Sequence, residues 1–146
     1  MYKAIIAIGV ATAACLVAGC GGSGGGETAA TGMTKAQFIK KAEAICSKTQ
    51  EEGREARIAL EKAKGEELEL DVAVRRIVGP TLKKEAEELR SLTAPAGEKE
   101  KLTRMIDNLS ESAAAFAAKG SKTTSTPNFE AFRREIEAYG LEACGV

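Results

Sequence analysis

The sequence predicts an all-α domain: an up-and-down four-helix bundle with one disulfide, preceded by a signal peptide and a flexible Gly-rich tether. Three observations predict this fold. In four segments beyond residue 32, apolar residues recur at spacings of three and four, the pattern of helices that bury one face. Capping residues, glycine and proline stand at the ends of these segments. The connecting loops are short, which favours an up-and-down order of neighbouring helices.

Residues 1–19 have the form of a signal peptide. Lys3 is the only charged residue before Glu27, and it precedes a run of apolar or small residues from Ala4 to Ala18. As a helix this run would be about 22 Å long, which is less than the ~30 Å hydrocarbon core of a bilayer. We therefore expect a signal that is removed and not a stable membrane span.

The signal ends in Leu16, Val17, Ala18 and Gly19, and Cys20 follows. This stretch resembles the lipobox of bacterial lipoproteins, in which an aliphatic residue, then Ala or Ser, then Gly or Ala precede a cysteine. The resemblance implies that Cys20 is acylated through its sulfur, becomes the first mature residue and anchors the protein at the extracytoplasmic face of the cell membrane. The alternatives are a secretory signal with a chance cysteine and an uncleaved anchor.

Residues 20–32 would be the lipidated cysteine and a flexible linker. The stretch from Gly21 to Gly32 has almost no apolar side chains beyond alanine, so it cannot bury enough surface to offset the entropy of ordering it. A glycine-rich coil of this length spans on the order of 20 Å. We expect the folded domain to comprise residues 33–146.

The first helix is expected from Thr34 to about Lys64. Thr34 and Gln37 have the spacing of a capping box, and Gly65 provides the stop. The predicted buried stripe of this helix consists of Phe38, Ala42, Ile45, Thr49, Ala56, Leu60 and Ala63.

The second helix is expected to begin near Glu66, because several early acids suit the positive end of the helix dipole. Gly79-Pro80 interrupts it, since proline lacks an N–H and crowds the preceding turn, so we expect the helix to be kinked or broken there. Its predicted apolar stripe consists of Leu70, Val74, Ile77, Val78, Leu82, Ala86 and Leu89.

Two further helices complete the bundle. A turn over residues 93–97 leads to a helix from about Glu98 to Lys119, which Gly120 ends. A polar loop then leads to Thr126-Pro127, a cap followed by proline at the first helical position. The last helix is expected to stop at Gly140.

The four cysteines divide by position. Cys15 would leave with the signal and Cys20 would be acylated, so Cys46 and Cys144 remain as one pair in a compartment that permits disulfides. The alternative is two free buried thiols. The sequence contains no C-x-x-C redox motif.

Both ends of the domain carry a second resemblance. The stretch FIKKAEAIC and the ending YGLEACG are similar to uncharacterised small membrane lipoproteins of actinobacteria, in which an F-I-x-K-A-x-x-I-C start and a Y-G-L-x-x-C-G end recur. The resemblance implies a secreted, membrane-tethered helical domain with Cys46 and Cys144 paired. It implies no particular activity.

The composition excludes several chemistries. The absence of histidine removes Ser-His and Cys-His pairs and the usual zinc and haem ligands, so we predict no catalytic, cofactor-binding or metal-binding residues and no enzyme. Two carboxylate pairs share helix faces, Glu85 with Glu88 and Asp107 with Glu111. Cation binding or acid catalysis is one interpretation of these pairs, but a solvated surface is the one we predict.

Charge and aromatic content limit the partners. Lys plus Arg equals Asp plus Glu, 21 of each, which provides no basic footprint for nucleic acid. The four Phe fall on the predicted core stripes and Trp is absent, so no base- or sugar-stacking platform is visible. The arginine pairs Arg75-Arg76 and Arg133-Arg134 could meet anionic lipid, although paired surface arginines are usually just solvated.

Two functional classes follow from the sequence. The expected function is a lipid-anchored binding or structural module of the cell envelope, whose partner would be a protein, the wall or the membrane surface. The alternative is a carrier of a small apolar ligand or lipid, in which the bundle opens along Gly79-Pro80. A carrier requires an apolar cavity between helices, whereas a module would have a filled core and an exposed patch.

Overall fold

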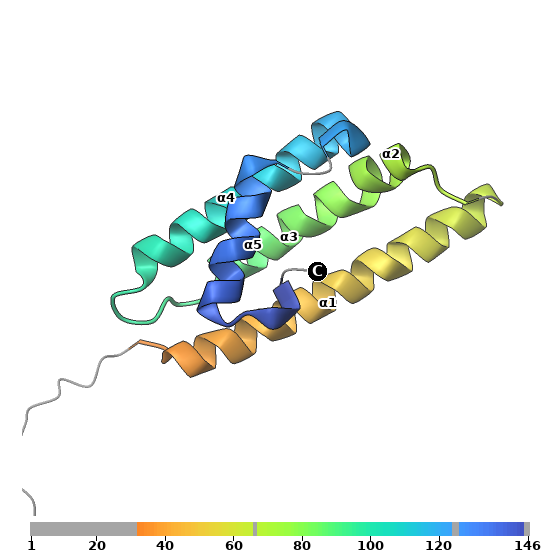
Figure 1. Cartoon of the computed structure of the whole chain (residues 1–146). Coiled ribbons are helices and arrows are strands. Elements are labelled where there is room, and N and C mark those ends of the chain that lie inside the picture. Colours follow the sequence, from red (N-terminus) through yellow and green to blue (C-terminus); the bar gives the residue numbers. More distant parts are fainter. Residues whose placement is uncertain (1–31, 66, 124–125, 145–146) are drawn as a thin grey trace, which may run out of the picture.

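The structure is a computed structural model that describes residues 32–65, 67–123 and 126–144. These residues form a helical fold, with no strand among them. Figure 1 shows their arrangement as a helical bundle. The α-helices are α1 (Lys35–Lys64), α2 (Leu70–Ala73), α3 (Gly79–Arg90), α4 (Lys99–Lys119) and α5 (Pro127–Tyr139). Val74–Val78 is a π-helical turn, and Gly120–Thr123 and Glu142–Cys144 are 3-10 helices. The predicted all-α class is confirmed.

Helix α1 begins and ends as its sequence predicts. The Thr34 hydroxyl accepts a hydrogen bond from the Gln37 amide at 3.2 Å, and the Thr34 amide donates to the Gln37 side chain at 2.9 Å, which completes the capping box. Gly65 adopts the left-handed conformation with φ of 73° and ends the helix.

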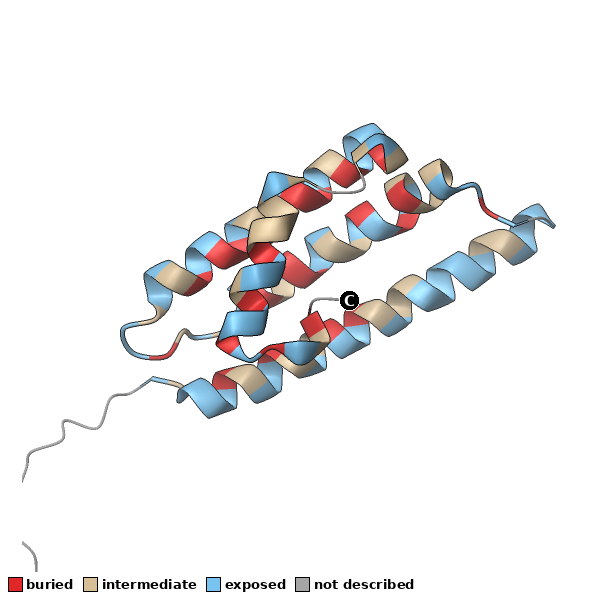
Figure 2. Cartoon of the chain, in the orientation of Figure 1, coloured by how far each residue is buried: buried red, intermediate tan, exposed pale blue. Residues whose placement is uncertain are grey.

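Only the first half of α1 is packed into the core. Phe38, Ala42, Cys46 and Thr49 are buried. The predicted stripe is wrong further on, because Ala56 and Ala63 are exposed. Ile58, which is not part of that stripe, is 51% exposed. Figure 2 shows this change from buried to mostly exposed residues along the helix.

The second helix differs from its prediction in two ways. It begins at Leu70 and not near Glu66, and the chain from Leu70 to Arg90 stays helical through Gly79 and Pro80. Of the two predicted alternatives, a kink and a break, the break is therefore wrong. In its place the π-helical turn Val74–Val78 precedes the proline, and the Gly79 amide donates to the Val74 carbonyl, five residues back. The wider turn accommodates the proline ring, which in a regular helix would crowd the carbonyl four residues earlier.

The last two helices also have their predicted limits. Helix α4 ends at Lys119 with Gly120 as its C-cap, and the Thr126 hydroxyl caps α5 by accepting from the Phe129 amide at 3.0 Å. Gly140 ends α5 with φ of 92°. The Leu141 amide then donates to the Ile136 carbonyl, a Schellman-type turn that directs the tail toward α1.

Helix α3 occupies the middle of the bundle. It packs against both α1 and α4, and α5 packs against α4, crossing it steeply in the view of Figure 1. The largest fully buried side chains come from all four long helices and the tail: Phe38, Leu89, Met105, Leu109, Phe132, Ile136, Tyr139 and Leu141. Every buried side chain among the described residues lies between positions 38 and 144, so a domain starting at Met33 retains this core.

Candidate functional site

A disulfide joins α1 to the end of the described chain. Cys46 and Cys144 are bonded with an S–S distance of 2.01 Å and a Cα–Cα distance of 5.0 Å, which confirms the predicted pairing. The tail is also held to α1 by hydrogen bonds. The Gln50 side chain donates to the Ala143 carbonyl, and the Glu142 amide donates to a Glu43 carboxylate oxygen at 3.3 Å.

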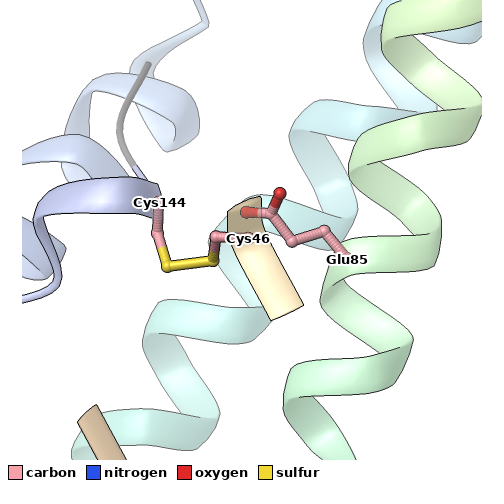
Figure 3. A group of neighbouring side chains, drawn as sticks. All are labelled: Cys46, Glu85 and Cys144. Atoms are coloured by element: carbon pink, nitrogen blue, oxygen red, sulfur yellow. A yellow bond between two sulfur atoms is a disulfide. The ribbon is translucent and has the colours of Figure 1, made fainter. Parts of the chain in front are cut away.

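Glu85 of α3 lies beside this disulfide and is only 2% exposed. Figure 3 shows its carboxylate extending from α3 toward Cys46. One ligand atom from each of Cys46, Glu85 and Cys144 lies within 4.8 Å of the others. Metal ions bind the thiolate form of cysteine, so the disulfide leaves this cluster with a single carboxylate as a metal-ligating group.

Thr49 of α1 is the hydrogen-bond partner of Glu85. Its hydroxyl lies 2.8 Å from Glu85 Oε2, 3.1 Å from the Ile45 carbonyl and 3.0 Å from the Cys46 carbonyl. A hydroxyl has one proton, so Thr49 donates to an ionised Glu85, or accepts from a protonated Glu85 while donating to a carbonyl. This geometry serves both protonation states of the carboxyl group.

The second carboxylate oxygen of Glu85 accepts no hydrogen bond from the described residues. This oxygen, Oε1, is buried. Burial raises the pKa of Glu85 to about 7, and the hydrogen bond from Thr49 opposes part of that rise. Glu85 therefore changes charge close to neutral pH.

A groove with a volume of 400 Å³ runs alongside Glu85 between α1 and the helix from Leu70 to Arg90. We call it the disulfide groove. Its α1 wall consists of Gln50, Gly53, Arg54 and Arg57. The facing wall is mainly apolar and consists of Leu70, Ala73, Val74, Ile77, Val78 and Leu82, with Thr81 and Glu85 as its polar members. Phe129 and Cys144 complete the lining.

Charged side chains at the groove are paired with one another. Arg57 Nε lies 2.8 Å from Glu61, and Arg54 forms a hydrogen-bonded ion pair with Glu51. Further along, Lys84 bridges from α3 to Glu52, and Lys48 of α1 lies 3.2 Å from Glu88. These last two ion pairs tie α1 to α3, but as exposed pairs each contributes little to stability.

The sequence prediction for Glu85 was a solvated surface, and the structure shows this to be wrong. Its spacing does contain a signal: Leu82 is three residues before it and Leu89 four after, so Glu85 shares their face of the helix. Its predicted companion Glu88 is an ion-pair partner of two lysines.

The other candidate polar residues are placed differently. Asp107 pairs with Arg90 at 2.6 Å on the surface, as predicted for a solvated carboxylate. Arg75 is not a simple surface arginine, because it pairs with Asp71 at 2.7 Å and donates to the Ala118 carbonyl. Cys20 and the lipobox residues Leu16, Val17, Ala18 and Gly19 lie outside the described residues.

Comparisons with protein-family models, curated proteins and solved structures found no match to this chain. Among the described residues, no helix is both long enough and apolar enough to cross a membrane. The disulfide groove is thus the candidate site on geometry alone, because it combines an open apolar surface with a buried carboxylate.

Proposed function

We propose that this protein is a lipoprotein of the cell envelope whose helical domain binds a small apolar ligand in the disulfide groove. In this proposal residues 1–19 are a signal peptide, Cys20 is the lipid anchor, and residues 33–146 are an up-and-down four-helix bundle at the extracytoplasmic face. The domain binds and does not catalyse a reaction.

The observation that supports a binding role is the groove itself. Its volume of 400 Å³ falls in the range of small-molecule sites, and most of one wall is apolar. The groove exists because α1 continues beyond the packed core, so its second half faces the π-helical turn, and α4 and α5 contribute only Phe129 to the lining.

A second candidate has its own observation. Leu70 and Ile58 are 64% and 51% exposed, and Val78 is exposed as well. Apolar side chains left in water suit a protein partner that would cover them. An envelope protein or wall component docked over these residues is the alternative function.

Nile red, a neutral apolar dye, tests the groove. We expect the soluble domain from Met33 to Val146 to bind one dye molecule with enhanced fluorescence. Ala73→Phe, which fills the groove, should weaken binding at least about tenfold, whereas Ala114→Phe on the exposed face of α4 should not. Absence of saturable binding by the wild-type domain, or equal loss in both variants, would favour the docking alternative.

The anchor needs a separate test. Intact-mass analysis of the membrane fraction should show a mature chain that begins at an acylated Cys20. Cys20→Ala should remove the acyl mass and release the protein from the membrane, because two acyl chains suffice for stable anchoring. A wild-type chain without acyl mass, together with a variant that stays membrane-bound, would refute the lipid anchor.

A further inference from the structure

We propose that the ligand of the disulfide groove is a small apolar molecule with a protonated amine, and that its ammonium group donates a hydrogen bond to Glu85 Oε1. This inference rests on the proposed function and adds the chemical class of the ligand.

The first observation behind this proposal is that Glu85 Oε1 has no hydrogen-bond partner among the described residues. Among the described residues, two buried side-chain oxygens have no hydrogen-bond partner, Glu85 Oε1 and the Tyr139 hydroxyl, and of these two residues only Glu85 lines the groove. A buried acceptor without a partner costs free energy that a donor from a ligand would recover. Glu85 lines the groove, so a ligand there can supply this donor.

The charge that the ligand should carry follows from the surroundings of Glu85. On α1, Arg54 and Arg57 pair with Glu51 and Glu61. The elements other than α1 and the helix of Glu85 contribute Phe129 and Cys144 to the groove lining. Neither carries a charge, because the sulfur of Cys144 is in the disulfide. Within the described ranges, then, no cation pairs with Glu85.

Two further cations lie at the interface between α1 and α3, Lys48 on α1 and Lys84 on α3. Lys84 and Lys48 engage Glu52 and Glu88, and the pKa of Glu85 is raised by burial without an opposing positive charge. A buried carboxylate must either hold its proton or find a counter-ion. A ligand ammonium would be that counter-ion.

The other residues that line the disulfide groove favour a ligand that is apolar apart from its amine. Val74, Ile77 and Leu82 offer hydrocarbon next to Glu85, and the groove has room for a molecule of small-ligand size. A bare metal ion is a poorer fit, because hard cations take six or more oxygen ligands and this site presents one carboxylate beside a disulfide. An apolar amine matches both the charge and the surface.

Three compounds that share a decyl chain and differ only in the head group test which head group the groove prefers. Decylamine, decanol and decanoate are each titrated against the Nile red complex of the soluble domain at pH 8. We expect decylamine to displace the dye at concentrations at least about tenfold below those of decanol, and decanoate to be the weakest competitor. In Glu85→Gln, which keeps the shape but not the charge, amine and alcohol should compete equally.

The pH profile of the wild-type domain gives a second readout that needs no variant. Alkylamines stay protonated up to about pH 10, so decylamine affinity should follow the ionisation of Glu85 and rise on the order of 30-fold between pH 5.5 and pH 8. At pH 6 its binding should release close to one proton, measurable by calorimetry in two buffers. Decanol should release none.

The outcomes separate the two levels of the proposal. Failure of Nile red to bind would refute the groove as a small-molecule site. Normal dye binding with no amine preference, a flat pH profile or no proton release would refute the amine and leave the groove site intact. Preference for decanoate would assign the opposite charge to the ligand and overturn this inference.

Discussion

Gly79 lies against the backbone of Ala117 so closely that a Cβ on Gly79 would be 2.7 Å from the Ala117 amide nitrogen. Real Cβ atoms do not make such a contact with backbone. Gly79 itself has a φ of −56°, an ordinary helical value, so the glycine is required by packing and not by backbone conformation. It allows α3 and α4 to meet directly after the π-helical turn.

Gly79→Ala should therefore destabilise the domain by about 1–3 kcal/mol, the usual cost of overpacking. Gly53→Ala is the matched control. It also replaces a helical glycine, but its Cβ would meet only the Thr81 side chain, at 3.2 Å, and α-helix propensity favours alanine by about 1 kcal/mol. Urea unfolding of both variants checks this. Equal stabilities would show that α4 can move away from Gly79 freely.

Gly120 packs against the start of the second helix. Its φ is 62°, and a Cβ there would come within 2.1 Å of Asp71 Oδ1, the oxygen that accepts hydrogen bonds from the Ser121 amide and hydroxyl. Arg75 is the main cause that lowers the pKa of Asp71, through a hydrogen bond to its other oxygen.

Gly120→Ala should displace Asp71 and cost about 1–3 kcal/mol more than Gly65→Ala. Gly65 also has a positive φ, but its ψ of 13° places it in the left-handed region that other residues occasionally adopt, and nothing lies within 4 Å of a Cβ added there. The ψ of −145° at Gly120 lies outside that region, so its backbone conformation adds to the cost of the Asp71 contact. Thermal unfolding of the two variants gives the comparison. A Gly65 variant as unstable as the Gly120 variant would contradict a special role for the Asp71 contact.

Reduction of the disulfide should lower the melting temperature of the domain by on the order of 15 °C. The bond closes a loop of 98 residues, for which the chain-entropy model gives about 4–5 kcal/mol. Calorimetry with and without a reductant measures the effect. The domain from Met33 contains only these two cysteines, so a thiol count on the unfolded, unreduced chain should be zero. Two free thiols would disprove the bond in the isolated domain.

Glu85 should make the domain less stable as the pH rises. Its pKa is about 7 in the folded chain and 4.5 as the reference for an exposed glutamate, so between these values the folded state binds more protons than the unfolded state. The stability associated with protonated Glu85 is complete below about pH 4.5 and is lost as the pH rises through 7.

The variant Glu85→Gln lacks this titration. Its stability relative to the wild type should therefore increase by roughly 3 kcal/mol from pH 4 to pH 8, as the pKa difference requires. Because the other carboxylates are common to both chains, their contributions cancel in this difference. Urea unfolding at several pH values supplies the curve, and a constant difference across the range would show that Glu85 does not titrate with a raised pKa.

Local signals in the sequence were sufficient to predict most helix ends, the start of the second helix excepted. Thr34 and Thr126 accept hydrogen bonds from amides three residues ahead, and Gly65 and Gly140 adopt the left-handed conformation, because capping depends on residues within one turn of each other. The pairing of Cys46 with Cys144 was also predictable, since the other two cysteines fall in or at the end of the proposed signal.

Burial could not be predicted from one helix at a time. The periodic stripe along α1 continues past Thr49, but α3 and the tail, the main packing partners of α1, leave Ala56 and Ala63 exposed. For the same reason the sequence prediction of a solvated Glu85 is wrong: spacing identifies which residues share a face, whereas a neighbouring helix decides how much of that face loses its water.

The sequence by itself thus determined where most of the helices begin and end, the absence of histidine chemistry and the cysteine pair. Tertiary structure alone decided three features: the π-helical turn that replaces a break at Pro80, the open groove beside α1, and the desolvation of Glu85 next to the disulfide. Capping and helix propensity act over a few neighbouring residues, but an open groove and a raised pKa depend on how segments some forty to sixty residues apart are brought together, as Cys46, Glu85 and Cys144 are here.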